Sequence, residues 1–180
     1  MSAYTRQERF EKRYVVSPPD GLDQYIFQHY NGLCVIGLAE GHPACRADAA
    51  ASLTVDFSAG GKNVVTENHV TGKRKKGGIS FTADSVVCTV TVGEQQYTVK
   101  AVVPGQLLEA NDRLEREPGL LISEPDRAGF VCIVMPPGGD KYFEKEGARV
   151  PHLMTYDDYQ RKAAGTCHPG ESEFDSRHEL

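Results

Sequence analysis

The chain has 180 residues, of which 39% are hydrophobic and 25% are charged, as is typical of one globular domain with tails. Its net charge of −5 argues against a protein that coats nucleic acid. No apolar run approaches the ~20 residues that cross a bilayer, and the charged start MSAYTRQERFEKRY lacks the apolar core of a secretory signal, so we expect neither feature.

The first 20 residues are polar and end in SPPDG, which favours an extended segment followed by a turn. We expect a flexible N-terminal arm over residues 1–20. The stretch ERFEKRY within it mixes both charges with aromatic rings. It either folds onto a partner, through Arg9, Phe10, Arg13 and Tyr14, or covers one end of the domain that follows.

A series of short strands is predicted after the arm. QYIFQHYNGLCVIGLA predicts a hairpin that turns at Asn31-Gly32, the strongest short turn signal. ASLTVDFS predicts a strand with alternate apolar residues on one side, and NVVTENHV predicts a weaker strand. Further strands are expected around ISF and over residues 85–92.

A second hairpin is predicted with a defined register. If Gly93-Glu94 forms a type II′ loop, with glycine at the position that requires positive φ, Val92 lies opposite Gln95. This register makes one face apolar and the other polar, and a shift by one residue would destroy the match. The same register pairs Val90 with Tyr97, Thr89 with Thr98, Cys88 with Val99 and Val86 with Ala101.

The chain then bends at Pro104-Gly105, and QLLEANDRLEREPGLL predicts one short amphipathic turn. GFVCIVMP predicts the final buried strand. Short strands at spacings of 8–12 residues indicate a β-sandwich or barrel, which we expect to span residues 21–137.

A C-terminal extension over residues 138–180 follows, and it is expected to end in a disordered polar tail. One helix is predicted within it, near residues 156–164. Thr155 and Asp158 resemble a capping box at the start of this helix, and Gly165 stands where a C-terminal glycine belongs.

Two resemblances now bear on the fold. VVPGQLLEANDRLEREPGLL, followed by FVCIVM, resembles the C-terminal half of the glycine-cleavage H-protein, including the bend glycine Gly105 and the turn residue Asn111. From about residue 9 to 160 the chain is similar to the Abitram family, also called Simiate. The segments that carry this similarity are RYVV, IFQHYNGLCVIGLAEGHP, VTGKRKKGG, YTVKAVVPGQLLEAN and LMTYDDYQ.

The resemblance implies a barrel-sandwich hybrid, the single hybrid motif of lipoyl and biotinyl carriers, with a short C-terminal helix. It also implies binding to monomeric and filamentous actin, an influence on actin polymerisation, and a role in transcription. The location that it implies is the nucleus, including nuclear speckles, and the cytoplasm, including actin-rich cell projections.

A carrier needs a primary amine at its exposed hairpin tip, and neither Gly93 nor Glu94 has one. Lys100 lies six residues beyond the turn, where it projects from the sheet. We therefore expect a non-enzymatic interaction protein without a cofactor. The alternatives are a docking subunit of a larger assembly and a carrier that uses another lysine.

The sequence KRKK is the main candidate contact. Lys73, Arg74, Lys75 and Lys76 are flanked by glycines, so four cations stand on one turn. They either contact an acidic partner, namely an actin filament, a phosphate backbone or the acidic groove of an import receptor, or form a solvated loop. No base-reading or stacking motif is nearby, so we do not expect direct binding of nucleic acid.

The five cysteines include no CxxC pair, and Cys34, Cys88 and Cys132 lie in apolar runs, where a thiol packs as a small apolar group. This pattern suits a reducing cytosol or nucleus. EGHPAC and CHPGE bring histidine near cysteine and glutamate, but their spacing fits neither a zinc site nor a nucleophilic pair. We assign no catalytic, metal or cofactor-binding residue.

Overall fold

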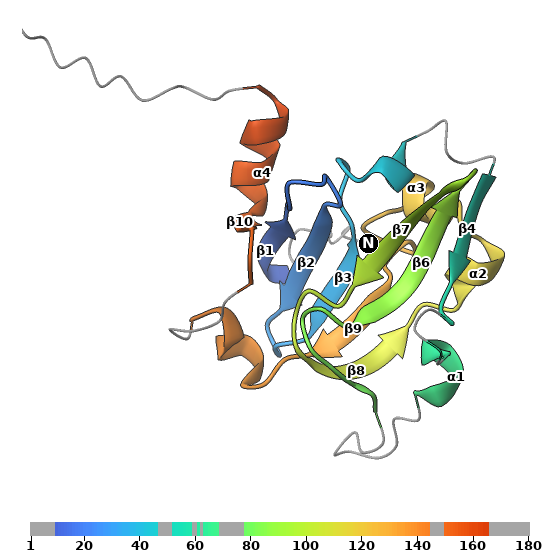
Figure 1. The fold of residues 1–180 in the computed structure, drawn as a ribbon. Helices are drawn as coiled ribbons and strands as arrows, with labels where there is room; N and C mark the ends of the chain where they lie inside the picture. Colours follow the sequence, from blue (N-terminus) through green and yellow to red (C-terminus); the bar gives the residue numbers. More distant parts are fainter. Residues whose placement is uncertain are drawn as a thin grey trace, which may run out of the picture.

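The computed structural model of the protein describes residues 10–46, 52–58, 61, 63–68, 78–144 and 150–165, with the backbone alone at residues 10 and 11. These residues form two β-sheets, a few short helices and a longer helix at the C-terminal end (Figure 1). The mainly β architecture expected from the sequence is therefore confirmed.

Every pair of neighbouring strands in the two sheets is antiparallel. The larger sheet has seven strands, in the spatial order β10 (Leu153–Thr155), β1 (Phe10–Val16), β2 (Gln24–His29), β3 (Cys34–Leu38), β9 (Cys132–Met135), β8 (Gly105–Ala110) and β5 (Ser80–Phe81). The smaller sheet has three, in the order β4 (Leu53–Asp56), β6 (Val86–Val92) and β7 (Gln95–Lys100). The described strands thus form two sheets rather than one closed barrel.

Short helical segments connect the strands. They are η2 (Pro43–Cys45), α1 (Val64–Glu67), α2 (Arg113–Arg116), α3 (Leu120–Ser123) and η4 (Gly139–Glu144), and the longer α4 (Tyr156–Ala163) follows β10. None of the helices in the described ranges is both long enough and apolar enough to cross a bilayer.

The core lies between the two sheets, because apolar side chains of both meet in one cluster. Ile26 and Ile36 come from the larger sheet, and Val90 and Val99 come from the smaller one. All four side chains are fully buried. Burial of a side chain of this kind contributes roughly 1.5–3 kcal/mol, so the contact between the sheets is a main source of stability.

The opening hairpin is confirmed: β2 and β3 pair around a turn at Asn31-Gly32. Gly32 has a φ of 89°, and a Cβ atom there would lie 2.4 Å from the backbone nitrogen of Asp140. Only glycine fits this position, since the turn also packs against the first residues of η4.

The hairpin of β6 and β7 has the predicted register over most of its length. Of its two turn residues only Gly93 has a positive φ, 59°, as a type II′ turn requires. A bulge at Val87 then shifts the pairing, so that Val86 lies opposite Lys100 and not opposite Ala101. The last predicted pair is therefore wrong, because one extra residue is accommodated in β6.

The predicted strand before residue 58 is confirmed, and Leu53, Val55 and Phe57 are all buried. The weaker strand expected for NVVTENHV is wrong, because residues 64–67 form α1. The side chain of Asn63 accepts a hydrogen bond of 3.0 Å from the Thr66 N–H and caps this single turn.

Two further segments differ from the expectation. Residues 10–16 were expected in a flexible arm but form β1, which pairs with β2 on one side and β10 on the other. Residues 105–110 were expected to begin an amphipathic turn but form β8, between β9 and β5. The sequence did not indicate either strand, because the first segment is highly charged and the second follows a bend.

The predicted C-terminal helix is confirmed as α4. The Thr155 hydroxyl accepts a hydrogen bond of 3.2 Å from the Asp158 N–H at its start. Gly165 has a φ of 71° directly after its end.

One tyrosine attaches α4 to the sheet. The Tyr159 hydroxyl donates to Asp23 Oδ2 and accepts from the Gly41 N–H, both at 2.8 Å. Together with β10, this contact means that the folded unit extends beyond both boundaries, 21 and 137, that the sequence suggested.

Candidate functional site

The resemblance to lipoyl and biotinyl carriers predicts an attachment lysine at the tip of the β6–β7 hairpin. Gly93 and Glu94 are exposed at this tip, and neither offers an amine that could form an amide with a cofactor. Lys100 lies at the opposite end of β7, next to the larger sheet. The residues that the structure describes at this tip thus lack the group that carrier chemistry needs.

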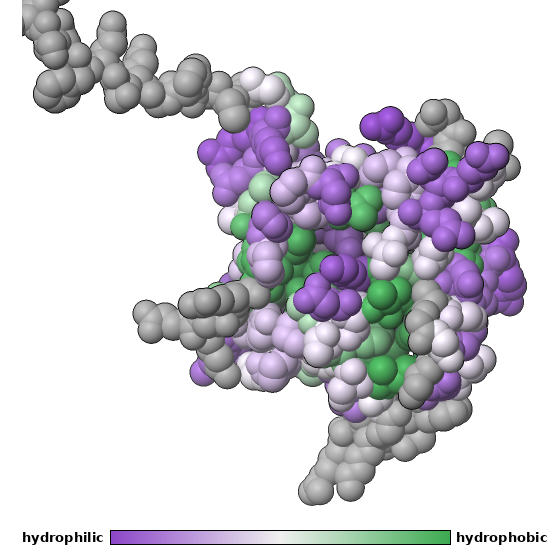
Figure 2. Space-filling model, in the orientation of Figure 1, coloured by the Kyte–Doolittle hydropathy of each residue, from purple (hydrophilic) through white to green (hydrophobic). Residues whose placement is uncertain are grey.

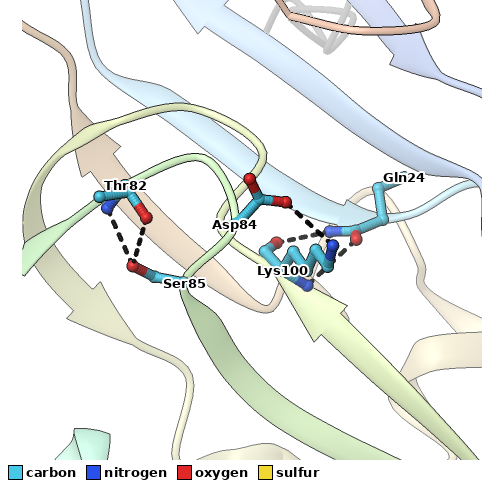
Figure 3. Close-up of polar contacts among 5 residues, drawn as sticks. All are labelled: Gln24, Thr82, Asp84, Ser85 and Lys100. Carbon is cyan, nitrogen blue, oxygen red and sulfur yellow. Dashed lines mark hydrogen bonds and ion pairs between the residues drawn. The ribbon is translucent and has the colours of Figure 1, made fainter.

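Lys100 is instead part of a polar bridge between the two sheets (Figure 3). The side-chain amide of Gln24 donates to the Lys100 carbonyl oxygen at 2.8 Å and accepts from the Lys100 N–H at 3.2 Å. The Lys100 ammonium group lies 3.0 Å from Asp84 Oδ1. The amide of Gln24 is 4% exposed and takes the place that the backbone of another strand would have.

Asp84 belongs to the turn between β5 and β6. The Thr82 N–H donates to Ser85 Oγ at 2.9 Å, and the hydroxyl oxygens of the two residues lie 3.1 Å apart (Figure 3). The Ser85 N–H also donates to the Thr82 carbonyl oxygen at 3.1 Å. These reciprocal bonds close the turn, which presents the Asp84 carboxylate to solvent.

A cleft of about 180 Å³ opens beside this bridge. Its lining residues come from four separate segments of the chain, within residues 16–24, 83–84, 98–102 and 150–152. Apolar side chains such as Val16, Leu22 and Val150 form its walls, while Asp20 and Asp84 lie among its polar residues. No motif in the sequence announced this cleft, because only the fold brings the four segments together.

Figure 2 shows hydrophilic residues in the middle of this face, where β7 ends in Figure 1, with apolar residues on both sides. A mixed surface of this kind differs from the mainly polar surface around α4 in the same view. Apolar walls next to a few polar groups are typical of places where proteins bind ligands.

The backbone is strained at two positions of this cleft. Among the described residues, the non-glycine residues with positive φ are Val102, at 51°, and His152, at 58°, and both line the cleft. The Val103 N–H donates to the Ala101 carbonyl oxygen at 2.6 Å, so Val102 is the centre of a tight γ-turn. A β-branched residue adopts this conformation only where the surroundings enforce it.

Most of the candidate contact residues from the sequence lie outside the described ranges. These are Lys73, Arg74, Lys75, Lys76 and Arg9. Phe10 begins β1, but its side chain is likewise outside the description.

Arg13 and Tyr14 are described, and both contact other parts of the chain. The Arg13 guanidinium carbon lies 5.2 Å from the centre of the Phe27 ring, a cation–π distance. The Tyr14 ring lies 4.6 Å from that of Phe143. Both side chains are half-buried, so they hold β1 in the sheet whatever else they bind.

The described thiols have no disulfide partner, and burial raises the pKa of Cys34 and of Cys45 to about 12. These thiols stay protonated at neutral pH and are poor nucleophiles. His42 is fully buried, which lowers its pKa to about 4, and its Nδ1 accepts a hydrogen bond of 3.1 Å from the Ala44 N–H. His42 therefore caps η2 as a neutral ring, and no group of three possible metal ligands lies together within the described ranges.

Curated proteins named Protein Abitram are similar to the chain. The protein of Dictyostelium discoideum is 31% identical over 159 residues, 88% of this chain and 84% of that protein. The protein of Danio rerio is 31% identical over 140 residues, 77% and 75% of the two chains. The human protein is 30% identical over 140 residues, 77% and 74% of the two chains.

Among solved structures, the crystal structure of a glycine cleavage system H protein from Mycobacterium marinum has a similar fold, with a TM-score of 0.53. The match covers 85% of this chain and 97% of the H protein, at 17% sequence identity. No protein-family profile matches the chain. The expected H-protein-like barrel-sandwich hybrid is confirmed by this likeness.

Proposed function

The chain belongs to the Abitram family, and we propose that it is a non-enzymatic actin-binding protein that modulates actin polymerisation and transcription. The observation that carries the proposal is a carrier fold whose hairpin tip, Gly93-Glu94, offers no amine. A fold of this kind retains a surface for other macromolecules without the chemistry of a bound cofactor. The actin and transcription roles are supported by the resemblance to the family.

The basic cluster Lys73–Lys76 is the proposed principal contact. Asn68 lies before the segment that carries it, and Asn68 Oδ1 accepts a hydrogen bond of 3.2 Å from the Ile79 N–H. The amide nitrogen of Asn68 also donates to the Leu108 carbonyl oxygen at 3.3 Å. The two described ends of the segment are thus anchored next to each other on β8, and four cations lie between them in the sequence of an acidic protein.

The N-terminal residues form the second part of the proposed contact. Arg9 directly precedes β1 and Phe10 is its first residue, opposite His29 of β2, so both stand at the end of the strand and are the better candidates within ERFEKRY. Arg13 and Tyr14 already pack on Phe27 and Phe143. We expect substitutions at these two positions to weaken binding only to the extent that they destabilise the fold.

Co-sedimentation with actin filaments tests the proposal. The variant with alanine at residues 73–76 is expected to pellet several-fold less than the wild type. The reason is that these cations contribute to binding through long-range electrostatic attraction to an acidic filament. The matched control replaces Arg113 and Arg116, two exposed arginines of α2, with alanine and is expected to pellet like the wild type.

Raised salt should weaken filament binding by the wild type and leave little difference in pelleting between the wild type and the variants. The reason is that the electrostatic attraction is screened within about 10 Å at 0.1 M salt. Equal pelleting of wild type and the cluster variant at low salt would remove Lys73–Lys76 from the contact. Failure of the wild type to pellet, or to alter the rate of polymerisation, would contradict the actin-binding proposal itself.

We also propose that the protein works in both nucleus and cytoplasm. Imaging of the full chain with a small tag is expected to show both pools, and depletion is expected to change nascent RNA synthesis. A protein confined to one compartment, or unchanged RNA synthesis, would contradict this part of the proposal.

The likeness to an H protein supports one alternative function, a carrier that uses another lysine. Lys100 is an unfavourable choice, because its ammonium group is ion-paired with Asp84. Intact mass spectrometry after expression in cells that attach lipoyl and biotinyl groups separates the alternatives, since a carrier gains the mass of its cofactor. A docking subunit of a larger assembly would instead be revealed by stoichiometric co-purification of its partners.

A further inference from the structure

The outer edge of β7 is open over part of its length. Because the two-residue turn is flanked by a hydrogen-bonded pair, the backbone groups of Gln95, Tyr97 and Val99 point toward β6. The N–H and C=O groups of Gln96, Thr98 and Lys100 therefore point away from β6. In the described part of the chain no strand pairs with this side of β7.

The three outward positions of β7 are not equivalent. At Lys100 the side-chain amide of Gln24 accepts from the N–H and donates to the C=O, as an adjoining strand would. Among the described residues nothing takes this role at Gln96 and Thr98, and both residues are exposed. Within the described ranges the edge thus presents two free donors and two free acceptors, a template for one more strand.

The cleft lies at the Lys100 end of this open edge, and Thr98 and Lys100 both line it. A strand that extends along β7 past Thr98 meets the cleft next. The apolar walls suit one small side chain, and two carboxylates, Asp20 and Asp84, lie beside them. Asp84 is 87% exposed, so its charge is available to a second cation besides Lys100.

We propose that this edge and cleft bind an extended segment of a partner protein that carries lysine or arginine. The segment adds to β7 through the backbone of Gln96 and Thr98 and inserts an aliphatic side chain into the cleft. Its cation lies between Asp20 and Asp84. Backbone hydrogen bonds supply the affinity of such strand addition, and side-chain pockets supply the specificity.

A second copy of this chain fits the edge less well. Antiparallel pairing of two β7 strands places the turn of one copy, with Glu94, near the Lys100 end of the other. There it meets Asp20 and the ion pair of Asp84 with Lys100, so three carboxylates share one cation. Like charges opposed across a strand pair are unfavourable, which favours a basic partner over self-association.

The inference is independent of actin binding, because it uses none of the residues 73–76. The probe is a fluorescein-labelled octapeptide, TKVKVKTG, which alternates small apolar and basic residues. We expect saturable binding with a dissociation constant of about 10–300 µM, as is appropriate for a short strand addition. In ¹⁵N spectra the amide signals of Gln96, Thr98 and Lys100 and the side-chain amide of Gln24 should shift.

Two altered peptides test the two kinds of contact. A peptide with N-methyl groups on the three central amides lacks strand donors and is expected to bind at least tenfold more weakly. The peptide TEVEVETG is expected not to bind, because its charges meet carboxylates.

Protein variants test the place of binding. Thr98→Pro removes an N–H that faces solvent and is tolerated on an edge strand, so the variant should fold and bind at least tenfold more weakly. Thr98→Val keeps the N–H and should bind like the wild type. Asp84→Asn should weaken binding of the basic peptide several-fold. Circular dichroism verifies that each variant is folded.

Hydrogen exchange gives a readout that needs no variant. The amides of Gln96 and Thr98 should exchange rapidly in the free protein and slow at least tenfold when the peptide is bound. No saturable binding below about 1 mM, or binding that N-methylation or a folded Thr98→Pro variant leaves unchanged, would overturn the proposal.

Discussion

Replacing Gln24 with methionine tests the bridge between the two sheets. Methionine has a similar length but neither donates nor accepts as an amide does, so both backbone groups of Lys100 lose their partner. These groups now make hydrogen bonds of 2.8 and 3.2 Å to a side chain that is 4% exposed. The change therefore removes two buried polar contacts without emptying the space.

The expected cost follows from what water can replace. Losing a hydrogen bond costs about 0.5–1.5 kcal/mol when water replaces the lost partner. A buried polar group that is left unpaired costs about 1–3 kcal/mol. The neighbouring cleft gives water access to one side of Lys100, so we expect a total loss of about 2–3 kcal/mol. For a chain of this size each kcal/mol lowers the melting temperature by roughly 2–4 °C.

Urea unfolding followed by far-ultraviolet circular dichroism is the appropriate assay, because the chain contains no tryptophan. The matched control is Gln96→Met, the same substitution on an exposed residue of β7, which we expect to change stability by less than about 0.5 kcal/mol. Equal stability of the two variants would refute the view that the amide of Gln24 joins the sheets.

Three further predictions concern the fold. Gly105→Ala should lower the free energy of urea unfolding by about 3 kcal/mol or more, because φ is 153° and a Cβ would lie 2.2 Å from the Met135 carbonyl oxygen. The control Gly119→Ala, where a Cβ meets nothing within 4 Å, should be nearly neutral. Equal effects of the two substitutions would contradict this prediction. The unfolding free energy should decrease as pH falls from about 6.5 toward 4, by up to ~3 kcal/mol from His42 alone. Burial lowers the pKa of the folded ring to about 4, while the unfolded chain takes up a proton near 6.5. His42→Asn should keep the cap and flatten this part of the pH profile, and an unflattened profile would assign the effect to another residue. Tyr159→Phe should cost about 2 kcal/mol and increase hydrogen exchange in α4 before the rest of the chain, because the hydrogen bonds of the hydroxyl group to Asp23 and Gly41, next to β2 and β3, are lost. Uniform exchange across the chain would speak against that role.

Local patterns predicted those elements whose signals depend only on neighbouring residues. The turn glycines Gly32 and Gly93 adopt the positive φ that their dipeptides indicated. The capping pair of Thr155 and Asp158 begins a helix at the expected residue. Each of these signals is decided within a few residues, so the sequence is sufficient.

Elements that depend on distant partners were missed. The charged β1 becomes a strand because β2 and β10 pair with it, and nothing within residues 10–16 announces those partners. The bulge at Val87 shifts the register only at the far end of its hairpin. The resemblance singled out Asn111 without explaining it, whereas the fold shows its amide donating to the carbonyl oxygens of Ala128 and Phe130, both at 2.7 Å.

The cleft was beyond sequence reasoning for the same reason. Gln24 reads as one polar residue of an alternating strand, and Val102 as an ordinary apolar residue before a proline. Their roles appear only when residues about 80 positions apart in the chain are brought into contact. The residues next to Val102 in the sequence give no indication that its backbone is strained.

The pairing of β10 with β1 has a consequence for how the protein is made. On the ribosome β1 emerges long before β10, because residues 17–152 are made between the two strands, so β1 waits for its outer neighbour while these residues are added. A chain released early would leave β1 able to pair with other polypeptides, a recognised route to aggregation. Shortened versions for expression should therefore retain the chain through residue 155.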